Sequence, residues 1–145
     1  MTASRSSSRR YVLDANALIA FFEGREPAAE RVRKLLAESD RIGVPLWMSA
    51  VNWGEVYYIE WRRHGEVKAR QAELNLQRLP VEVISADRER ASRAAALKQR
   101  HGLGYADAFA AELAIDIRAS LVTADPEFSK LGKALSVYAL PRHES

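Results

Sequence analysis

Short apolar runs alternate along this chain with longer stretches in which apolar residues recur every third or fourth position. The short runs predict β-strands, and the longer stretches predict amphipathic helices. Regular alternation of the two is typical of βαβ units and therefore favours an α/β fold with a parallel sheet. The predicted strands are Tyr11–Leu13, about Ile42 to Met48, Val81–Ile84, Leu121–Val122 and Leu135–Leu140.

The predicted helices begin and end at residues with recognisable capping roles. Ser49 is a typical N-cap and Gly65 a typical stop, so together they delimit a long helix that ends at His64. Pro27 and Pro126 each suit the first turn of a helix. The full set comprises a short helix to Phe22, Pro27 to about Ser39, Ser49 to His64, one ending before Pro80, Asp87 to Arg100, Tyr105 to Arg118, and a short turn opened by Pro126.

Composition adds limits on the class of protein. The 145 residues, 48% hydrophobic and 28% charged, match one soluble globular domain, which we expect to span residues 11–141 after a Ser/Arg-rich tail of residues 1–10. No apolar run approaches the roughly 20 residues that span a bilayer, and residues 1–10 do not resemble a signal peptide, so we expect a cytoplasmic protein without membrane contact. The absence of cysteine excludes disulfides, thiolate catalysis and Cys-ligated zinc.

The net charge of +3 is less informative than its sign suggests. Arg5, Arg9 and Arg10 lie in the tail, and the remaining chain carries 19 basic and 19 acidic residues. The charge therefore permits a polyanionic partner without requiring one. The tail is either a solvated terminus or an arm that contacts RNA.

Two acids follow predicted strands. Asp14 comes directly after Tyr11–Leu13, and Asp125 comes shortly after Leu121–Val122. In parallel sheets, ligands bind beyond the carboxyl ends of the strands, so acids there are well placed to hold a cation. Each also fits a second interpretation, an N-cap of the next helix, and one carboxylate can serve both purposes. Thr123 shares the strand parity of Asp125 and is expected to face the same cleft.

Glu55 lies inside a predicted helix, on the same face as Val51, Tyr58 and Ile59. A carboxylate on an apolar face is costly unless it is paired or bound to a metal. Glu55 is therefore either a site residue or the partner of an arginine.

Asp107 shares a helix face with Ala110, Ala111 and Ala114, small residues that allow close approach of a neighbour. Its alternative role is that of a first-turn acid favoured by the helix dipole. At 100° per residue, Glu112 and Asp116 lie about 140° and 180° away from Asp107, which predicts that both face solvent and stand outside the site.

Four segments of the chain together resemble the PIN-domain family, and VapC-like toxins in particular. They are Val12–Asn16, Ser49–Val56, Gly104–Ala111 and Leu121–Phe128, in the order and spacing of that family. The resemblance implies a PIN-like three-layer sandwich with a five-stranded parallel sheet flanked by helices. It also implies an acidic Mg²⁺ or Mn²⁺ site, cleavage of RNA, homodimer formation, and inhibition by a small antitoxin protein.

The expected site follows from the same residues. Carboxylates that converge in one cleft repel one another unless a divalent cation neutralises them, and all-oxygen ligation suits Mg²⁺ or Mn²⁺. We expect Asp14 and Asp107 as primary ligands, with Asp125 as a ligand directly or through water. Glu55 is expected to bind the metal or position the attacking water. Asn16 and Thr123 would orient ligands or waters, and hydrolysis would leave a 3′-hydroxyl and a 5′-phosphate.

Other functions are weighed on the same residues. A PIN-like module that binds nucleic acid or protein without cutting stays open. A haloacid-dehalogenase-type phosphatase would need a second acid at Asn16. A metal-free ribonuclease would need paired histidines, but His64 and His101 each precede a glycine at a predicted helix end, and His143 lies in the C-terminal tail.

Aromatic and basic clusters suggest where partners bind. The aromatic group Trp47, Trp53, Tyr57, Tyr58 and Trp61 either packs in the core or lines a dimer or antitoxin interface. The basic groups Arg62 with Arg63, and Arg90, Arg93 and Arg100, either form a solvated surface or contact the RNA backbone.

Overall fold

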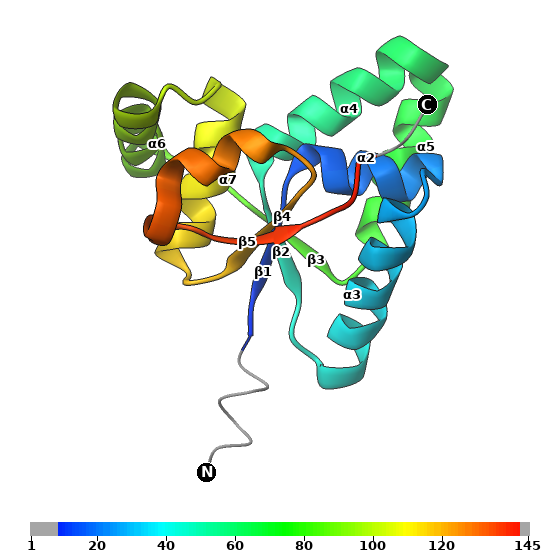
Figure 1. The fold of residues 1–145 in the computed structure, drawn as a ribbon. Coiled ribbons are helices and arrows are strands. Elements are labelled where there is room, and N and C mark those ends of the chain that lie inside the picture. Colours follow the sequence, from blue (N-terminus) through cyan, green and yellow to red (C-terminus); the bar gives the residue numbers. More distant parts are fainter. Residues whose placement is uncertain (1–8, 143–145) are drawn as a thin grey trace.

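The computed structural model describes residues 9–142 and contains one five-stranded sheet in which every pairing is parallel (Figure 1). The strand order is β3-β2-β1-β4-β5. The strands are β1 (Tyr11–Leu13), β2 (Leu46–Ser49), β3 (Val81–Ile84), β4 (Ser120–Thr123) and β5 (Ser136–Ala139). The expected α/β fold with a central parallel sheet is confirmed.

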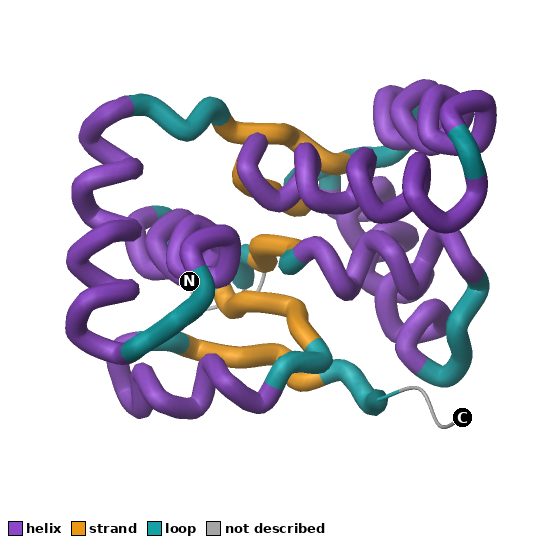
Figure 2. Tube along the Cα trace, turned by 90° about the horizontal axis from the view of Figure 1, so that it is seen from above, coloured by secondary structure: helices purple, strands orange, loops and turns teal. Residues whose placement is uncertain are grey.

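Helices connect the strands and cover both faces of the sheet (Figure 2). The predicted boundaries of the longest helix are confirmed, because the Ser49 hydroxyl accepts a hydrogen bond from Val51 N at 3.2 Å and the helix ends at His64 before Gly65. The helices are α2 (Ala15–Glu23), α3 (Ala28–Ile42), α4 (Ala50–His64), α5 (Glu66–Gln77), α6 (Arg88–His101), α7 (Tyr105–Asp116) and the 3₁₀ helix η1 (Pro126–Ala134).

Alternating residues of the central strands supply two separate apolar cores. Leu13 of β1 and Val122 of β4 pack with α2 and α3 on one face, while Val12 and Leu121 pack with α6, α7 and η1 on the other. Because successive side chains of a strand point to opposite faces, a strand buried on both sides has to be apolar throughout. The two cores therefore make the molecule a three-layer sandwich.

The predicted start of the second strand at Ile42 is wrong. Helix α3 continues to Ile42 and ends at Gly43, whose φ of 73° is a left-handed conformation that favours glycine. The carbonyl of Val44 then accepts a hydrogen bond from the Ser39 hydroxyl at 2.5 Å, so the residues between helix and strand form a connection. The strand was predicted to begin too early because the end of the helix and this connection also contain apolar residues, which lead into the strand.

The order of the strands places the ends of β1 and β4 side by side. From β1 the chain builds outward to β2 and β3, and then returns to add β4 and β5 on the other side of β1. The N–H of Asp14 donates to the Val122 carbonyl at 3.0 Å, which continues the pairing of the two strands beyond Leu13. This reversal is a topological switch point, where α/β proteins open a crevice at the carboxyl edge of the sheet.

Two further expectations concern the N-terminal tail and the absence of a membrane-spanning helix. Most of the Ser/Arg tail, residues 1–8, lies outside the described residues. Among residues 9–142, no helix combines the length and apolar character needed to cross a bilayer.

Candidate active site

Asp14 lies at the carboxyl end of β1 and is almost fully buried, with 2% of its surface exposed. Its Oδ1 accepts a hydrogen bond from Ala15 N at 2.8 Å and so caps helix α2. Its Oδ2 accepts from the Thr123 hydroxyl at 2.8 Å and from Asn16 Nδ2 at 3.1 Å. The cap and the position beside the crevice are therefore both present in one carboxylate.

Asn16 and Thr123 join the ends of the two central strands. Asn16 Nδ2 also donates to Thr123 Oγ1 at 3.1 Å, while Asn16 Oδ1 accepts from Ala124 N at 3.1 Å. Thr123 Oγ1 in turn accepts from Asp125 N at 3.0 Å. These contacts fix the orientation of the Asp14 carboxylate and of the backbone that leads to Asp125.

The four predicted acids line one pocket of about 390 Å³ at this edge of the sheet: Asp14, Glu55, Asp107 and Asp125. They come from β1, α4, α7 and the turn before η1. Asp125 Oδ1 caps η1 by accepting from Glu127 N at 2.9 Å, as the Asp-Pro sequence predicted. Asp107 folds back over the start of α7, where a Cβ on Gly104 would lie 3.3 Å from its Oδ2.

The pocket leaves its acids without basic partners. Within residues 9–142, none of the four carboxylates lies within ion-pair distance of a Lys, Arg or His. Burial, and then the charges of Asp107 and Glu55, raise the pKa of Asp14 to about 7, against the lowering effect of the Thr123 and Ala15 hydrogen bonds. Burial, and then the charges of Asp125, Glu55 and Glu127, raise the pKa of Asp107 to about 6. Burial also raises the pKa of Glu55.

A hard divalent cation fits this donor set. The site residues offer carboxylate, amide and hydroxyl oxygens, which are the ligands that Mg²⁺ and Mn²⁺ prefer. In the described part of the chain, the acids stand on separate walls, and no three of them bring oxygens within 4.8 Å of one another. This spacing leaves room for water ligands, several of which Mg²⁺ usually keeps.

The sequence model of the PIN-domain family matches residues 11–134 of this chain. The chain belongs to the PIN-domain family.

Solved structures of similar fold include several toxin–antitoxin proteins. A toxin–antitoxin complex from Klebsiella pneumoniae is 23% identical, with a TM-score of 0.64, and the match covers 90% of this chain and 99% of that one. DNA-bound VapBC from Salmonella typhimurium is 18% identical, with a TM-score of 0.69 and coverage of 90% and 98%. VapC20 from Mycobacterium tuberculosis, a sarcin–ricin-loop-cleaving toxin, is 18% identical, with a TM-score of 0.68 and coverage of 84% and 95%. Among curated proteins, none matches this chain. These likenesses show the fold of the PIN domain.

The prediction that Glu112 faces solvent is wrong. Glu112 is only 3% exposed, and its carboxylate is bound by Arg93 Nε at 2.8 Å and by Arg90 at 3.1 Å. Helix α6 packs over this side of α7, so the face opposite the pocket is a helix–helix interface. Asp116 is exposed and pairs with Arg90 at 3.1 Å. Neither acid lines the acidic pocket, and Arg90 and Arg93 serve this interface.

Tyr58 does not share the buried face of α4 as predicted. It is 61% exposed, because the buried stripe of this helix runs through Asn52, Val56 and Glu60. Trp47 and Trp53 pack against the cores, whereas Trp61 is exposed together with Tyr58. The aromatic group is therefore divided between core and surface.

His64 and His101 end α4 and α6 before Gly65 and Gly102, as predicted. They lie on different helices, and neither lines the acidic pocket. His143 lies outside the described residues.

Sequence reasoning missed two residues around the pocket, Asn52 and Arg25. Asn52 is buried and donates from Nδ2 to the Ala106 carbonyl at 3.0 Å, which ties α4 to α7 next to Asp107. The sequence could have indicated Asn52 by its position three residues before Glu55, which places both side chains on neighbouring positions of one helix face. Arg25 and Arg63 also line the acidic pocket, and both pair with Glu23.

Proposed function

We propose that this PIN domain is a metal-dependent endoribonuclease and the toxin of a VapBC-type toxin–antitoxin pair. It would hydrolyse RNA phosphodiester bonds and leave 3′-hydroxyl and 5′-phosphate ends. The observation that carries the proposal is the convergence of four carboxylates, without basic partners among the described residues, at the switch point of the sheet. Membership of the PIN-domain family supports it, as does the fold shared with toxins, one of which cleaves the sarcin–ricin loop.

Asp14, Asp107 and Asp125 would hold Mg²⁺ or Mn²⁺, directly or through water, and Glu55 would complete the site. When bound, the metal supplies an acidified water and stabilises negative charge on the scissile phosphate. Thr123 and Asn16 donate to Asp14 Oδ2 and so hold this carboxylate at a fixed angle to the pocket. Glu55 is half-buried with a raised pKa, which suits a group that positions the attacking water and accepts its proton.

The proposed partners follow from the same neighbours and from the surface of α4. We propose that the chain binds an antitoxin protein, because solved structures of the same fold are toxin–antitoxin complexes. We also propose a homodimer, as the resemblance to VapC-like toxins implies. Tyr58 and Trp61 are large, exposed aromatics on one helix, and such residues are enriched at protein interfaces.

The test of the reaction is cleavage of total RNA by the purified chain. With Mn²⁺ or Mg²⁺ we expect discrete fragments with 5′-phosphates, whose ends are mapped by sequencing, and chelator should stop their release. A synthetic RNA with a single 2′-deoxy nucleotide at the mapped site should still be cut, because the attacking group is water rather than the 2′-hydroxyl.

Two results would contradict the proposal in different ways. Cleavage that survives chelator, fails on the deoxy substrate and leaves a 2′,3′-cyclic phosphate would indicate metal-free chemistry. Binding of RNA without cleavage under every metal condition would favour the alternative, a PIN-like binding module.

A further inference from the structure

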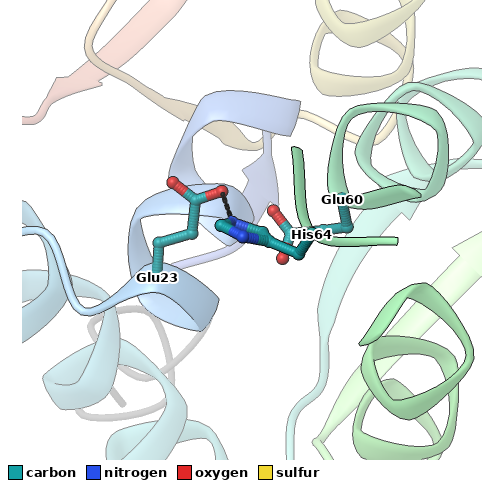
Figure 3. A group of neighbouring side chains, drawn as sticks. All are labelled: Glu23, Glu60 and His64. Atoms are coloured by element: carbon teal, nitrogen blue, oxygen red, sulfur yellow. Dashed lines mark hydrogen bonds and ion pairs between the residues drawn. The ribbon is translucent and has the colours of Figure 1, made fainter. Parts of the chain in front are cut away.

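Helices α2 and α4 also contact each other at their carboxyl ends, beside a second cleft that shares Arg25 with the acidic pocket. Glu23 is the last residue of α2, while Glu60 and His64 lie four residues apart on one face of α4 (Figure 3). One ligand atom from each of these three side chains lies within 4.8 Å of the other two. Two ligands at this spacing on a helix, with a third from a neighbouring element, form a common metal-binding arrangement.

Glu60 gives an independent sign that this cluster takes a ligand. Its side chain is 95% buried, with 5% exposed, and its Oε2 has no hydrogen-bond partner among the described residues. A buried carboxylate oxygen without a partner is costly unless a proton or a cation satisfies it, and a cation at this position would also contact Glu23 and His64. Glu23, Glu60 and His64 all line a cleft of about 450 Å³.

Glu23 is arranged so that one of its oxygens is held and the other faces the cluster. Arg25 binds Oε1 at 2.7 Å, while Oε2 lies 3.1 Å from His64 Nε2. A hydrogen bond of this kind to the second oxygen is usual for ligating carboxylates. Arg63 contacts both oxygens at 3.2 Å and is partly exposed, so it can turn toward solvent when a cation binds.

We propose that Glu23, Glu60 and His64 form a second metal site, one that binds a transition metal of the Zn²⁺ type. The donor set is one imidazole nitrogen and two carboxylate oxygens. Imidazole suits Zn²⁺ and is a poor ligand for Mg²⁺, so this cluster and the all-oxygen pocket select different metals. Three protein ligands leave a coordination position open toward the cleft.

The position of the site gives it a structural consequence. Helix α2 is capped by Asp14 and helix α4 carries Glu55, so a metal bound at their far ends would fasten together two elements that supply the acidic pocket. Because the metal binds the folded chain, Zn²⁺ should raise the unfolding temperature. The inference does not depend on the proposed ribonuclease activity.

The experiment is a calorimetric titration of the full, untagged and metal-depleted chain with Zn²⁺, in millimolar Mg²⁺ to occupy the acidic pocket. We expect one Zn²⁺ to bind, and the ring ¹⁵N resonances of His64 to shift while those of His101 stay unchanged. His64→Ala and Glu60→Gln should each weaken binding at least about tenfold. His101→Ala is the matched control, because His101 also ends a helix before a glycine, and it should bind Zn²⁺ like the parent.

The proposal is overturned if the parent binds no Zn²⁺, if His64→Ala and Glu60→Gln bind it as tightly as the parent, or if His101→Ala loses it equally. Thermal unfolding of each metal-free variant checks that it is folded. Because His64 is exposed, His64→Ala is expected to fold like the parent.

Discussion

Two of the three acids on helix α7, Asp107 and Glu112, lie in opposite environments. Glu112 is the more deeply buried, yet Arg90 and Arg93 bind its carboxylate from α6. Asp107, near the start of the same helix, is only partly buried, but within residues 9–142 it has no ion pair, and burial and neighbouring acids raise its pKa to about 6. The charge of Glu112 is balanced by two arginines, whereas Asp107 has no basic partner among the described residues. If the proposed site is right, absence of a counter-charge, more than depth of burial, distinguishes its acids from a structural one.

The largest expected effect is on the rate of RNA cleavage, and it should distinguish Asp107 from Asp116 on the same helix. Asp107→Asn should reduce metal-dependent RNA cleavage by on the order of 100-fold or more, because it removes a charged metal ligand. Asp116→Asn is the matched control and should stay within a few-fold of the parent, since Asp116 faces solvent. Initial rates on one mapped RNA substrate measure both. Equal losses in the two variants would show that helix position does not distinguish these acids.

Glu112 should show the reverse behaviour, with loss of stability rather than of activity. Glu112→Gln removes the buried charge that Arg90 and Arg93 bind. We expect it to lower the free energy of unfolding by about 1–3 kcal/mol, because Arg90 keeps Asp116 as a partner and Arg93 is half-exposed. The rate of the folded fraction should stay within a few-fold of the parent. Urea unfolding measures the stability, with Glu127→Gln as a control that removes an exposed pair with Lys130 at little cost. A stable but inactive Glu112→Gln would place this acid in the active site.

A smaller effect is expected when the Asp14 carboxylate loses the hydroxyl group that orients it. Thr123→Val removes the hydroxyl that donates to Asp14 and accepts from Asp125 N, at almost constant volume. We expect Mn²⁺ to bind about tenfold more weakly, as is usual when a group that orients a ligand is lost. Ser120→Ala removes the other hydroxyl of β4, which bonds Ser136 at 2.7 Å, and should leave Mn²⁺ affinity unchanged. If the two variants bind Mn²⁺ alike, the hydroxyl of Thr123 has no part in the site.

The smallest effect concerns stability without metal and its dependence on pH. The pKa of Asp107 in the folded chain is about 6, above the ordinary 3.8, so the folded chain binds this proton more tightly than the unfolded chain. The stability that Asp107 contributes is therefore present below about pH 4 and is lost as the pH rises through 6. Asp107→Asn removes this loss and should stabilise the metal-free chain by about 1 kcal/mol at pH 8, after allowance for solvent screening.

Urea unfolding in chelator, at pH 4.5 and at pH 8, compares parent and variant. The gain should be clearly larger at pH 8. A gain that is the same at both values, or a variant less stable than the parent at pH 8, would contradict the raised pKa.

Local signals carried most of the fold prediction. Ser49, Gly65 and Asp125 act through backbone groups within a few residues, so their roles as caps can be recognised without knowledge of the packing. The acids after β1 and β4 could be placed together for a similar reason, because parallel strands present their carboxyl ends at one edge. Assignment of Asp14, Glu55, Asp107 and Asp125 to one chemical site stays a prediction until the variants are measured.

The errors arose where a distant segment supplies the partner. Helical phase correctly turned Glu112 away from Asp107, but it carried no information that α6 would cover that face with two arginines. The cluster of Glu23, Glu60 and His64 was missed for the same reason, since its members come from two helices and each resembles an ordinary polar residue near a helix end. Tertiary packing, which a local pattern does not encode, decides both cases.

The two oxygens of Asp14 have a consequence for any screen that collects inactive variants. One oxygen caps α2 and the other accepts from Thr123, so most replacements at this position remove a helix cap together with the proposed metal ligand. Asp107 forms no side-chain hydrogen bond among the described residues. Inactive clones altered at Asp107 should therefore accumulate as abundant full-length protein, while those altered at Asp14 should be recovered at lower abundance because quality control removes part of the product.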